Sequence, residues 1–129
     1  MALEKQLSVT MANRPATLAR MCGALGERNV NILGFMSIEH EGQNLVRIVV
    51  DNLPAALKVL AAIGYACTQE DVLSAKVQNR PGTLAKVAKA MGDAGININY
   101  AYLGAEPGSR QPLLMLSVSD PEKGKSLLK

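Results

Sequence analysis

The chain has 129 residues, of which 48% are hydrophobic and 19% are charged, with a formal net charge of +3. This composition excludes a disordered protein, and the mild, dispersed basic excess argues against a nucleic-acid binder, which needs a dense basic stripe. No apolar run approaches membrane-spanning length, and the N-terminus is charged where a secretory signal needs an apolar core. We therefore expect a globular cytoplasmic protein with no nucleic-acid partner and no membrane association.

One stretch of the sequence occurs twice. Residues 13–20 read NRPATLAR and residues 79–86 read NRPGTLAK, at an offset of 66 residues that also relates Asn31 to Asn97 without a gap. Two copies are too few for an open solenoid, which needs about three repeats to bury its faces. The duplication therefore predicts two small domains in tandem.

The domain boundary is expected between residues 1–70 and residues 71–129. Each half is then only about 65 residues long, a size at which a single core buries barely enough surface to be stable alone. We therefore expect the two halves to pack on each other or on a second chain. We expect the protein to be a homodimer or a higher oligomer.

The first copy is expected to follow the order βαββαβ. Apolar spacing and turn residues give strand 6–11, turn 13–15, a helix with Leu18, Met21, Cys22 and Leu25 on its inner face, strands 30–38 and 45–50, a helix ending at Ile63, and strand 65–69. Pro15 is expected at the first helical position, where its missing N–H is harmless, and the Asn13 side chain is expected to cap the helix. Strict alternation places Leu33 and Phe35 on the sheet face away from the helices.

The second copy repeats this pattern with two differences. Its elements are strand 72–77, a helix with Leu84, Val87, Ala88 and Met91 on its inner face, strands 96–103 and 113–118, and a helix opening at Asp120. Its hairpin loop, residues 104–112, is longer than the hairpin turn of the first copy. It also lacks a strand after the second helix, so either the chain is truncated or a neighbouring strand takes that place. Both copies have the ferredoxin-like order, an α+β fold with helices on one face of an antiparallel sheet.

Few side chains are available for catalysis or metal binding. His40, the only histidine, falls in a polar turn, while Cys22 and Cys67 have neither metal-ligand nor redox spacing. Catalysis needs a nucleophile or an acid–base group oriented by partners, and the chain shows no such set. Strands 45–50 and 113–118 carry no aromatic residue on which an RNA base would stack. We expect no enzymatic activity, no cofactor and no metal.

The motifs around the duplicated turn resemble the ACT domain, a family of small regulatory modules that bind amino acids. The matching segments are Asn79-Arg80-Pro81-Gly82 with Gly95-Ile96-Asn97-Ile98, and Asn13-Arg14-Pro15-Ala16 with Asn29-Val30-Asn31-Ile32. The resemblance covers nearly the whole chain, twice, as in stand-alone proteins made of an ACT pair. It implies a small regulatory protein that binds an amino acid effector and modulates a partner enzyme of amino-acid metabolism.

The resemblance also implies where the effector binds, namely between the turn before the first helix of one unit and the second strand of a neighbouring unit. The matching residues are Asn79, Arg80, Pro81, Gly82, Thr83, Leu84, Ile96, Asn97 and Ile98 in the second copy, and Asn13, Arg14, Pro15, Ala16, Thr17, Leu18, Asn31 and Ile32 in the first. Free N–H groups at a helix start favour an α-carboxylate. Asparagine amides and strand carbonyls can hold an α-ammonium.

The two turns are not expected to bind equally. Ala16 stands where the family pattern has a glycine, which the second copy keeps as Gly82. A Cβ at this position lies near the ligand's approach, so we expect tighter binding at the second turn. The alternative function is a structural or protein-interaction module without a small-molecule ligand, because Pro-Gly before a helix can also serve the turn alone.

Overall fold

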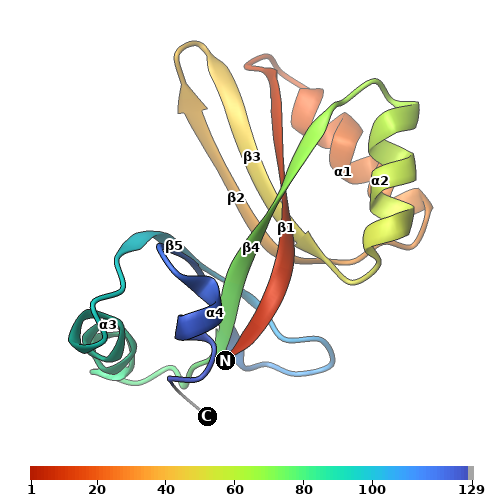
Figure 1. The fold of residues 1–129 in the computed structure, drawn as a ribbon. Helices are drawn as coiled ribbons and strands as arrows, with labels where there is room; N and C mark the ends of the chain where they lie inside the picture. The colour runs from red at the N-terminus through yellow and green to blue at the C-terminus, as the bar shows by residue number, and fades with distance from the viewer. Residues whose placement is uncertain (128–129) are drawn as a thin grey trace. The chain divides into compact units, whose positions relative to one another are not determined.

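The computed structural model describes residues 1–127, which form six strands and four helices (Figure 1). In chain order these are β1 (Ala2–Ala12), α1 (Thr17–Glu27), β2 (Ile32–His40), β3 (Gln43–Val50), α2 (Leu53–Ala62), β4 (Cys67–Lys76), α3 (Thr83–Asp93), β5 (Ile98–Ala105), β6 (Pro112–Val118) and α4 (Pro121–Gly124). The strand order is β2-β3-β1-β4-β6-β5, with antiparallel pairing of β1 with β3, β2 with β3, β4 with β6 and β5 with β6. An α+β protein with antiparallel strands is thus confirmed.

Two compact units make up the chain, and each is described by itself. The N-terminal unit is Lys5–Glu70, whereas the C-terminal unit joins Met1–Glu4 to the described residues from Asp71 onward. Strands β1 and β4 therefore each contribute residues to both units. The assignment of residues 1–70 and 71–129 as separate ACT domains stays a prediction.

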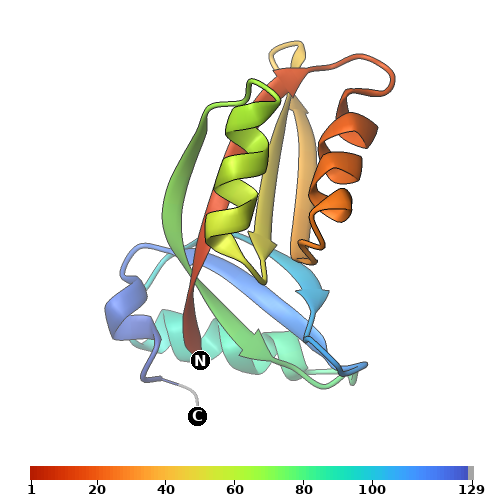
Figure 2. The ribbon, with the colours of Figure 1, turned by 90° about the vertical axis from the view of Figure 1, so that its right-hand side faces the viewer.

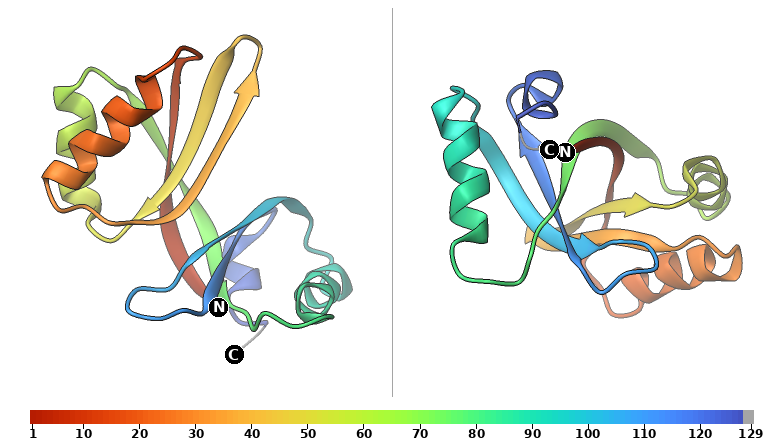
Figure 3. Two further views of the ribbon diagram at one scale, coloured as in Figure 1. Left: turned by 180° about the vertical axis from the view of Figure 1, so that it is seen from behind. Right: turned by 90° about the horizontal axis from the view of Figure 1, so that it is seen from below.

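The N-terminal unit has the strand order β2-β3-β1-β4, which is the ferredoxin-like order. Helices α1 and α2 lie on the same side of its strands (Figure 1 and Figure 3, left). Its largest fully buried apolar side chains come from β1, β3 and both helices, and are Leu7, Val9, Met21, Leu25, Val46, Ile48 and Leu60. Leu18 and Cys22 pack against this core, so the predicted inner face of α1 is confirmed.

The C-terminal unit has the matching order β1-β4-β6-β5 (Figure 2). Its core includes Leu73, Met91 and Leu116. The predicted inner face of α3 is only half right, because Val87 and Met91 are buried whereas Leu84 is 53% exposed. Ala88 is exposed as well. The helix that would flank α3 is the reason: α4 is one turn long, whereas α2 has ten residues.

The N-terminal unit ends with residues 67–70 of β4, whereas the C-terminal unit takes its fourth strand from residues 1–4 of β1. In the N-terminal unit, the Ser8 hydroxyl on β1 donates to a Glu70 carboxylate oxygen on β4. In the C-terminal unit, the Ser74 hydroxyl on β4 donates to Glu4 Oε1 on β1, at 3.1 Å. Both pairs are related by the 66-residue repeat. The strand that the second copy lacks is therefore supplied by Met1–Glu4, which is the neighbouring-strand alternative.

A β-bulge at the same place in both copies corrects the predicted sheet faces. The register shifts between Ile32 and Gly34 in β2, and between Ile98 and Tyr100 in β5. Beyond the shift Phe35 lies opposite Ile48, a core residue, and directly paired residues point to the same face. The placement of Phe35 away from the helices was therefore wrong, because one extra residue reverses the alternation.

Candidate functional site

The turn before α3 has the geometry of a type II β-turn. Gly82 has φ 88° and ψ −10°, and the Thr83 N–H donates to the Arg80 carbonyl at 3.4 Å. Such a turn favours proline at its second residue and needs a positive φ at its third, which glycine adopts without strain. Pro81 and Gly82 fill these two places. A Cβ added to Gly82 would meet nothing within 4 Å, so the glycine serves backbone conformation here and not packing.

The turn before α1 has the same shape without the glycine. Ala16 has φ 71° and ψ −7°, and the Thr17 N–H donates to the Arg14 carbonyl at 3.4 Å. The Thr17 hydroxyl adds bonds to the carbonyls of Ala12 and Arg14, at 2.9 Å and 3.0 Å. The sequence predicted Pro15 at the first helical position. In the structure it lies in the turn instead. The left-handed residue after each proline delays the helix start to the following threonine.

Helices α1 and α3 begin without a side-chain cap, whereas α2 and α4 begin with one. Asn52 Oδ1 accepts from the Ala55 N–H at 3.2 Å, and Asp120 Oδ1 accepts from the Lys123 N–H at 3.1 Å. No side chain caps α1 or α3, and neither has an acidic residue in its first turn. The predicted capping role of Asn13 was therefore wrong. The positive end of both dipoles stays open to an anion.

Basic side chains surround the start of α3. A hollow of about 330 Å³ is lined by Lys76, Arg80 and Lys86 together with Thr83 and Val87, and no acidic residue is part of its described lining. Lys76 is the one of the three cations that has an ion pair, to Glu106 at 2.7 Å, among the residues described. The hollow therefore combines an uncapped helix start with two basic side chains, Arg80 and Lys86, that have no ion pair among the residues described, a setting suited to a carboxylate ligand.

The start of α1 carries a related hollow of about 470 Å³. Its lining is Arg14, Pro15, Ala16, Thr17, Arg20 and Tyr65. Arg20 Nη2 also donates to the Ile63 carbonyl at 3.2 Å, which holds one of the two guanidinium groups against the chain. Both predicted turns thus lie at the edge of a hollow with two or three basic side chains.

The predicted strand residues sit at the other end of the same helices. The Asn97 N–H donates to Ser119 Oγ and the Asn97 carbonyl accepts from the Ser119 N–H, both at 2.9 Å. Asn31 exchanges the equivalent bonds with Asp51, at 2.9 Å and 3.0 Å. Both asparagines are exposed, and Asn97 Nδ2 donates to Asn99 Oδ1 at 3.0 Å. The side chains at these strand starts therefore remain accessible to solvent.

One unit alone does not bring the two halves of a predicted site together. Each turn lies before an 11-residue helix and each asparagine lies after it, so about 16 Å of helix separates them. Among the apolar members of the set, Ile96 is 4% exposed, and Leu18, Ile32 and Ile98 pack against the cores. The turn residues, Leu84 and the asparagines are the members of the set that lie at the surface.

Several lining residues were missed in the sequence. Arg20 and Lys86 were not among the residues predicted for the site, yet each lines the hollow beside its turn. Their spacing three residues after Thr17 and Thr83 was the available signal, because residues three apart share a helix face. Arg110 of the long hairpin loop lines a further hollow of about 480 Å³ with Asn79 and Arg80, and only the fold brings that loop to the turn.

The described residues offer little to a metal or a reaction. They contain no group of three or more His, Cys, Asp or Glu side chains able to hold a metal ion. Burial raises the pKa of both the Cys22 and the Cys67 thiol, and both side chains pack against the core of the N-terminal unit. His40 is 70% exposed and lies 3.9 Å from Glu41. None of the helices in the described residues has the length and apolar character needed to cross a membrane.

A family model described as an ACT domain pair matches residues 1–128. The chain therefore belongs to the ACT domain family, as a pair of such domains, which confirms the resemblance. A search of curated proteins found no match.

Solved structures share the fold over nearly the whole chain. Protein BT0572 from Bacteroides thetaiotaomicron is 26% identical, with a TM-score of 0.86 over 98% of this chain and 86% of that one. The ligand-free regulatory subunit of aspartate kinase from Thermus thermophilus is 18% identical, with a TM-score of 0.69 over 96% and 91%. The corresponding subunit from Thermus flavus is 19% identical, with a TM-score of 0.67 over 98% and 90%.

Proposed function

We propose that this ACT pair is a non-catalytic regulatory protein that binds a free amino acid and modulates a partner enzyme of amino-acid metabolism. Membership of the family supports the regulatory role. Two proteins of similar fold are regulatory subunits of aspartate kinase, which is an enzyme of that metabolism. We also propose that the protein is cytoplasmic and works as a homodimer or a higher oligomer.

The observation that carries this proposal is the contrast between helix starts. Asn52 and Asp120 cap the second helix of each copy, whereas the first helices begin at Ala16 and Gly82 with no side-chain cap. An uncapped helix start leaves backbone N–H groups without protein acceptors, and an α-carboxylate is a fitting acceptor for them. The same contrast occurs in both copies.

In the proposed complex the α-carboxylate lies at the N–H groups of Leu84 and Ala85. Arg80 and Lys86 stand beside it and contribute charge-assisted hydrogen bonds. A second ACT unit brought next to the turn contributes an asparagine of the Asn31 or Asn97 type, whose amide oxygen accepts from the α-ammonium. The remaining predicted residues, from Asn79 to Thr83 and from Asn13 to Thr17, shape the two turns.

The turn at Gly82 is proposed to bind more tightly than the turn at Ala16. Both have the same backbone shape, so the difference is the methyl group of Ala16 and the set of cations. Arg80 and Lys86 line the hollow beside Gly82 without an ion pair among the residues described, and Lys76 lines it while paired with Glu106. Only Arg14 and Arg20 line the hollow beside Ala16, and Arg20 is bonded to a carbonyl. Binding then shifts the balance between two arrangements, with a coupling of about 1–3 kcal/mol.

A thermal-shift screen against the common amino acids tests this function. At a hundredfold its dissociation constant, the effector adds about 2.7 kcal/mol of stability, which raises Tm by several degrees. Arg80→Gln should reduce that shift, whereas Arg28→Gln, an exposed change at the end of α1, should leave it intact. A flat response to every amino acid would favour the alternative of an interaction module without a ligand. Chemical conversion of the bound amino acid would refute the non-catalytic claim.

A further inference from the structure

An open hollow of about 480 Å³ lies where the long hairpin loop of the second copy meets the turn before α3. Its lining belongs wholly to the C-terminal unit, at the end of the sheet where β4 stops and β6 starts, and consists of Gln78, Asn79, Arg80, Ser109, Arg110, Gln111 and Pro112. The Val77 N–H donates to the Pro112 carbonyl at 3.2 Å, which holds the turn and the loop side by side. The hollow shares Gln78 and Arg80 with the hollow at the start of α3, whereas the hairpin residues line this one only.

The hairpin loop is held in place by hydrogen bonds of its own. Residues 106–109 form a turn with Pro-Gly at its centre, in which the Ser109 N–H donates to the Glu106 carbonyl at 3.3 Å. The Glu106 N–H donates to the Gln111 carbonyl at 3.3 Å, and the Gln111 N–H donates to Ser109 Oγ at 3.0 Å. Arg110 therefore projects from a backbone whose two neighbouring residues are bonded to each other.

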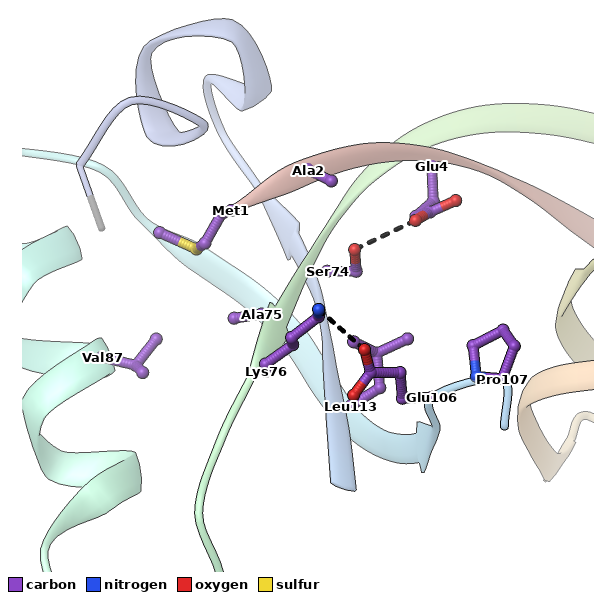
Figure 4. Close-up of a pocket in the computed structure, with 10 residues that line it drawn as sticks. All are labelled: Met1, Ala2, Glu4, Ser74, Ala75, Lys76, Val87, Glu106, Pro107 and Leu113. Carbon is purple, nitrogen blue, oxygen red and sulfur yellow. Dashed lines mark hydrogen bonds and ion pairs between the residues drawn. The ribbon is translucent and has the colours of Figure 1, made fainter. Parts of the chain in front are cut away.

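Arg80 and Arg110 are the charged residues of the described lining, and no carboxylate lies among them. Glu106, the only acidic residue of the hairpin loop, pairs instead with Lys76, whose Nζ lies 2.7 Å from Glu106 Oε1 (Figure 4). Neither guanidinium group has a hydrogen bond or an ion pair among the residues described. Two positive groups at one hollow repel each other unless an anion lies between them, so the hollow suits a ligand with more than one negative charge.

The other side chains of the lining are nearly all polar and uncharged. Gln78, Asn79 and Gln111 each carry an amide that both donates and accepts, and Ser109 keeps an O–H donor while its Oγ accepts from the backbone. Pro112 is the one apolar residue of the described lining, so the hollow offers no aromatic face on which a nucleobase would stack. Such a lining matches a ligand whose body is made of hydroxyl groups.

The first copy has no counterpart of this pair of arginines. Arg14 is the repeat counterpart of Arg80, but no residue of the first hairpin belongs to the described lining of its hollow. That hairpin turns within two residues, Glu41 and Gly42, so it has no loop comparable to residues 106–111. The two guanidinium groups at one hollow are therefore specific to the second copy.

We propose that this hollow binds the phosphate group of a small phosphorylated sugar. The phosphate oxygens accept from the guanidinium groups of Arg80 and Arg110, and the sugar hydroxyls bond to the amides of Gln78, Asn79 and Gln111. A phosphate monoester carries a charge of about −1.5 to −2 at pH 7 and three acceptor oxygens, so one group accepts from both arginines, whereas a carboxylate carries a single charge. This inference goes beyond the proposed function and does not rest on it.

Calorimetric titration of the full chain with glucose 6-phosphate tests this site. Arg110→Gln should weaken binding by about tenfold or more, because it removes a charge-assisted, bidentate donor from the phosphate. Arg110→Lys keeps the charge without the bidentate geometry, so it should recover only part of the affinity. Arg28→Gln is the matched control, since it removes an exposed arginine at the end of α1 that is not part of the hollow, and it should leave the affinity unchanged.

Ligand analogues separate the contribution of the phosphate from that of the sugar. Glucose lacks the anion, glucuronate carries a carboxylate in its place, and inorganic phosphate lacks the sugar, so each should bind about tenfold more weakly than glucose 6-phosphate or not at all. Backbone amide NMR should show the largest shifts with glucose 6-phosphate at Asn79, Arg110 and Gln111. Equal affinity for glucuronate or for inorganic phosphate would overturn the proposal.

Two further results would also overturn it. One is the absence of any heat or amide shift with glucose 6-phosphate up to about 10 mM, where even a site of millimolar affinity would be largely filled. The other is saturable binding that Arg110→Gln leaves unaffected, with amide shifts confined to Leu84 and Ala85, since the anion would then lie at the start of α3. Neither result would change the thermal shift expected with an amino acid, so the proposed function would stand without this site.

Discussion

Ala16 and Gly82 hold the same left-handed backbone with different side chains. Their φ angles are 71° and 88°, and each is the third residue of a turn that opens a helix. Alanine in this conformation crowds its Cβ against the backbone, at a cost of about 1–2 kcal/mol, whereas glycine does not. The first copy therefore has the same turn with a residue that fits it less well.

Replacing Ala16 by glycine should stabilise the protein by about 1 kcal/mol, because relief of the strained backbone exceeds the added freedom of the unfolded chain. Gly82→Ala should destabilise it by a similar amount. Urea unfolding with equal m-values checks both, and the pair forms its own control because the two positions are related by the repeat. A loss of stability in Ala16→Gly would contradict the turn geometry described here.

The position of the candidate site could be predicted from the sequence. Its uncapped helix start and some of its basic side chains could not. The repeated NRPxT segment marked both turns, and the cores contain the apolar residues of the predicted stripes at Met21, Leu25 and Met91. The cap was mispredicted because a proline before a helix fits either a first helical position or the second residue of a turn. Arg110 was not predicted, because the fold brings its hairpin loop to the turn from a distant segment, and Lys76 was not predicted, because it lies at the end of β4 outside the repeated motif.

Strand pairing determines two features of the sheets that the local sequence pattern does not predict. Alternation along β2 is correct up to Ile32 and reversed beyond Gly34, because the bulge is set by the partner strand. The supply of Met1–Glu4 to the C-terminal unit is likewise a long-range pairing, visible in the sequence only as an equivalence of β1 and β4. The sequence left that strand open between two alternatives, and no local signal distinguishes them.

Two helical glycines allow a matched test of whether α4 packs on Leu73. A Cβ on Gly124 would lie 2.6 Å from Leu73 Cδ1, whereas a Cβ on Gly92 of α3 would meet nothing within 4 Å. Gly124→Ala should therefore cost about 1–3 kcal/mol through overpacking. Gly92→Ala should add about 0.5–1 kcal/mol through helix propensity. Chemical unfolding measures both, and equal effects of the two changes would show that α4 is not packed on Leu73.

Apolar side chains are exposed on the two strands that end the strand order. Ile38 on β2 is 53% exposed and Leu103 on β5 is 54% exposed, and these two strands end the strand order. Long edge strands with exposed apolar residues are usually covered by another chain. This supports the proposal that the protein is a homo-oligomer.

Ile38→Lys should weaken that self-association, because it places a charge on the exposed edge. Gln43→Lys adds the same charge to the same hairpin at an exposed polar position and should leave association unchanged. Sedimentation velocity at high micromolar concentration measures both variants beside the wild type. A wild-type chain that sediments as a monomer throughout would contradict the prediction.

In the proposed function, an amino acid binds through its carboxylate at the uncapped start of α3. Backbone amide NMR tests it most directly, by titration with whichever amino acid gives the largest thermal shift and, in parallel, with its decarboxylated amine. The amino acid should move the Leu84 and Ala85 amide signals most, in a saturable way, and the amine should leave them in place. Saturable binding with both signals unmoved, or equal shifts from the amine, would contradict it.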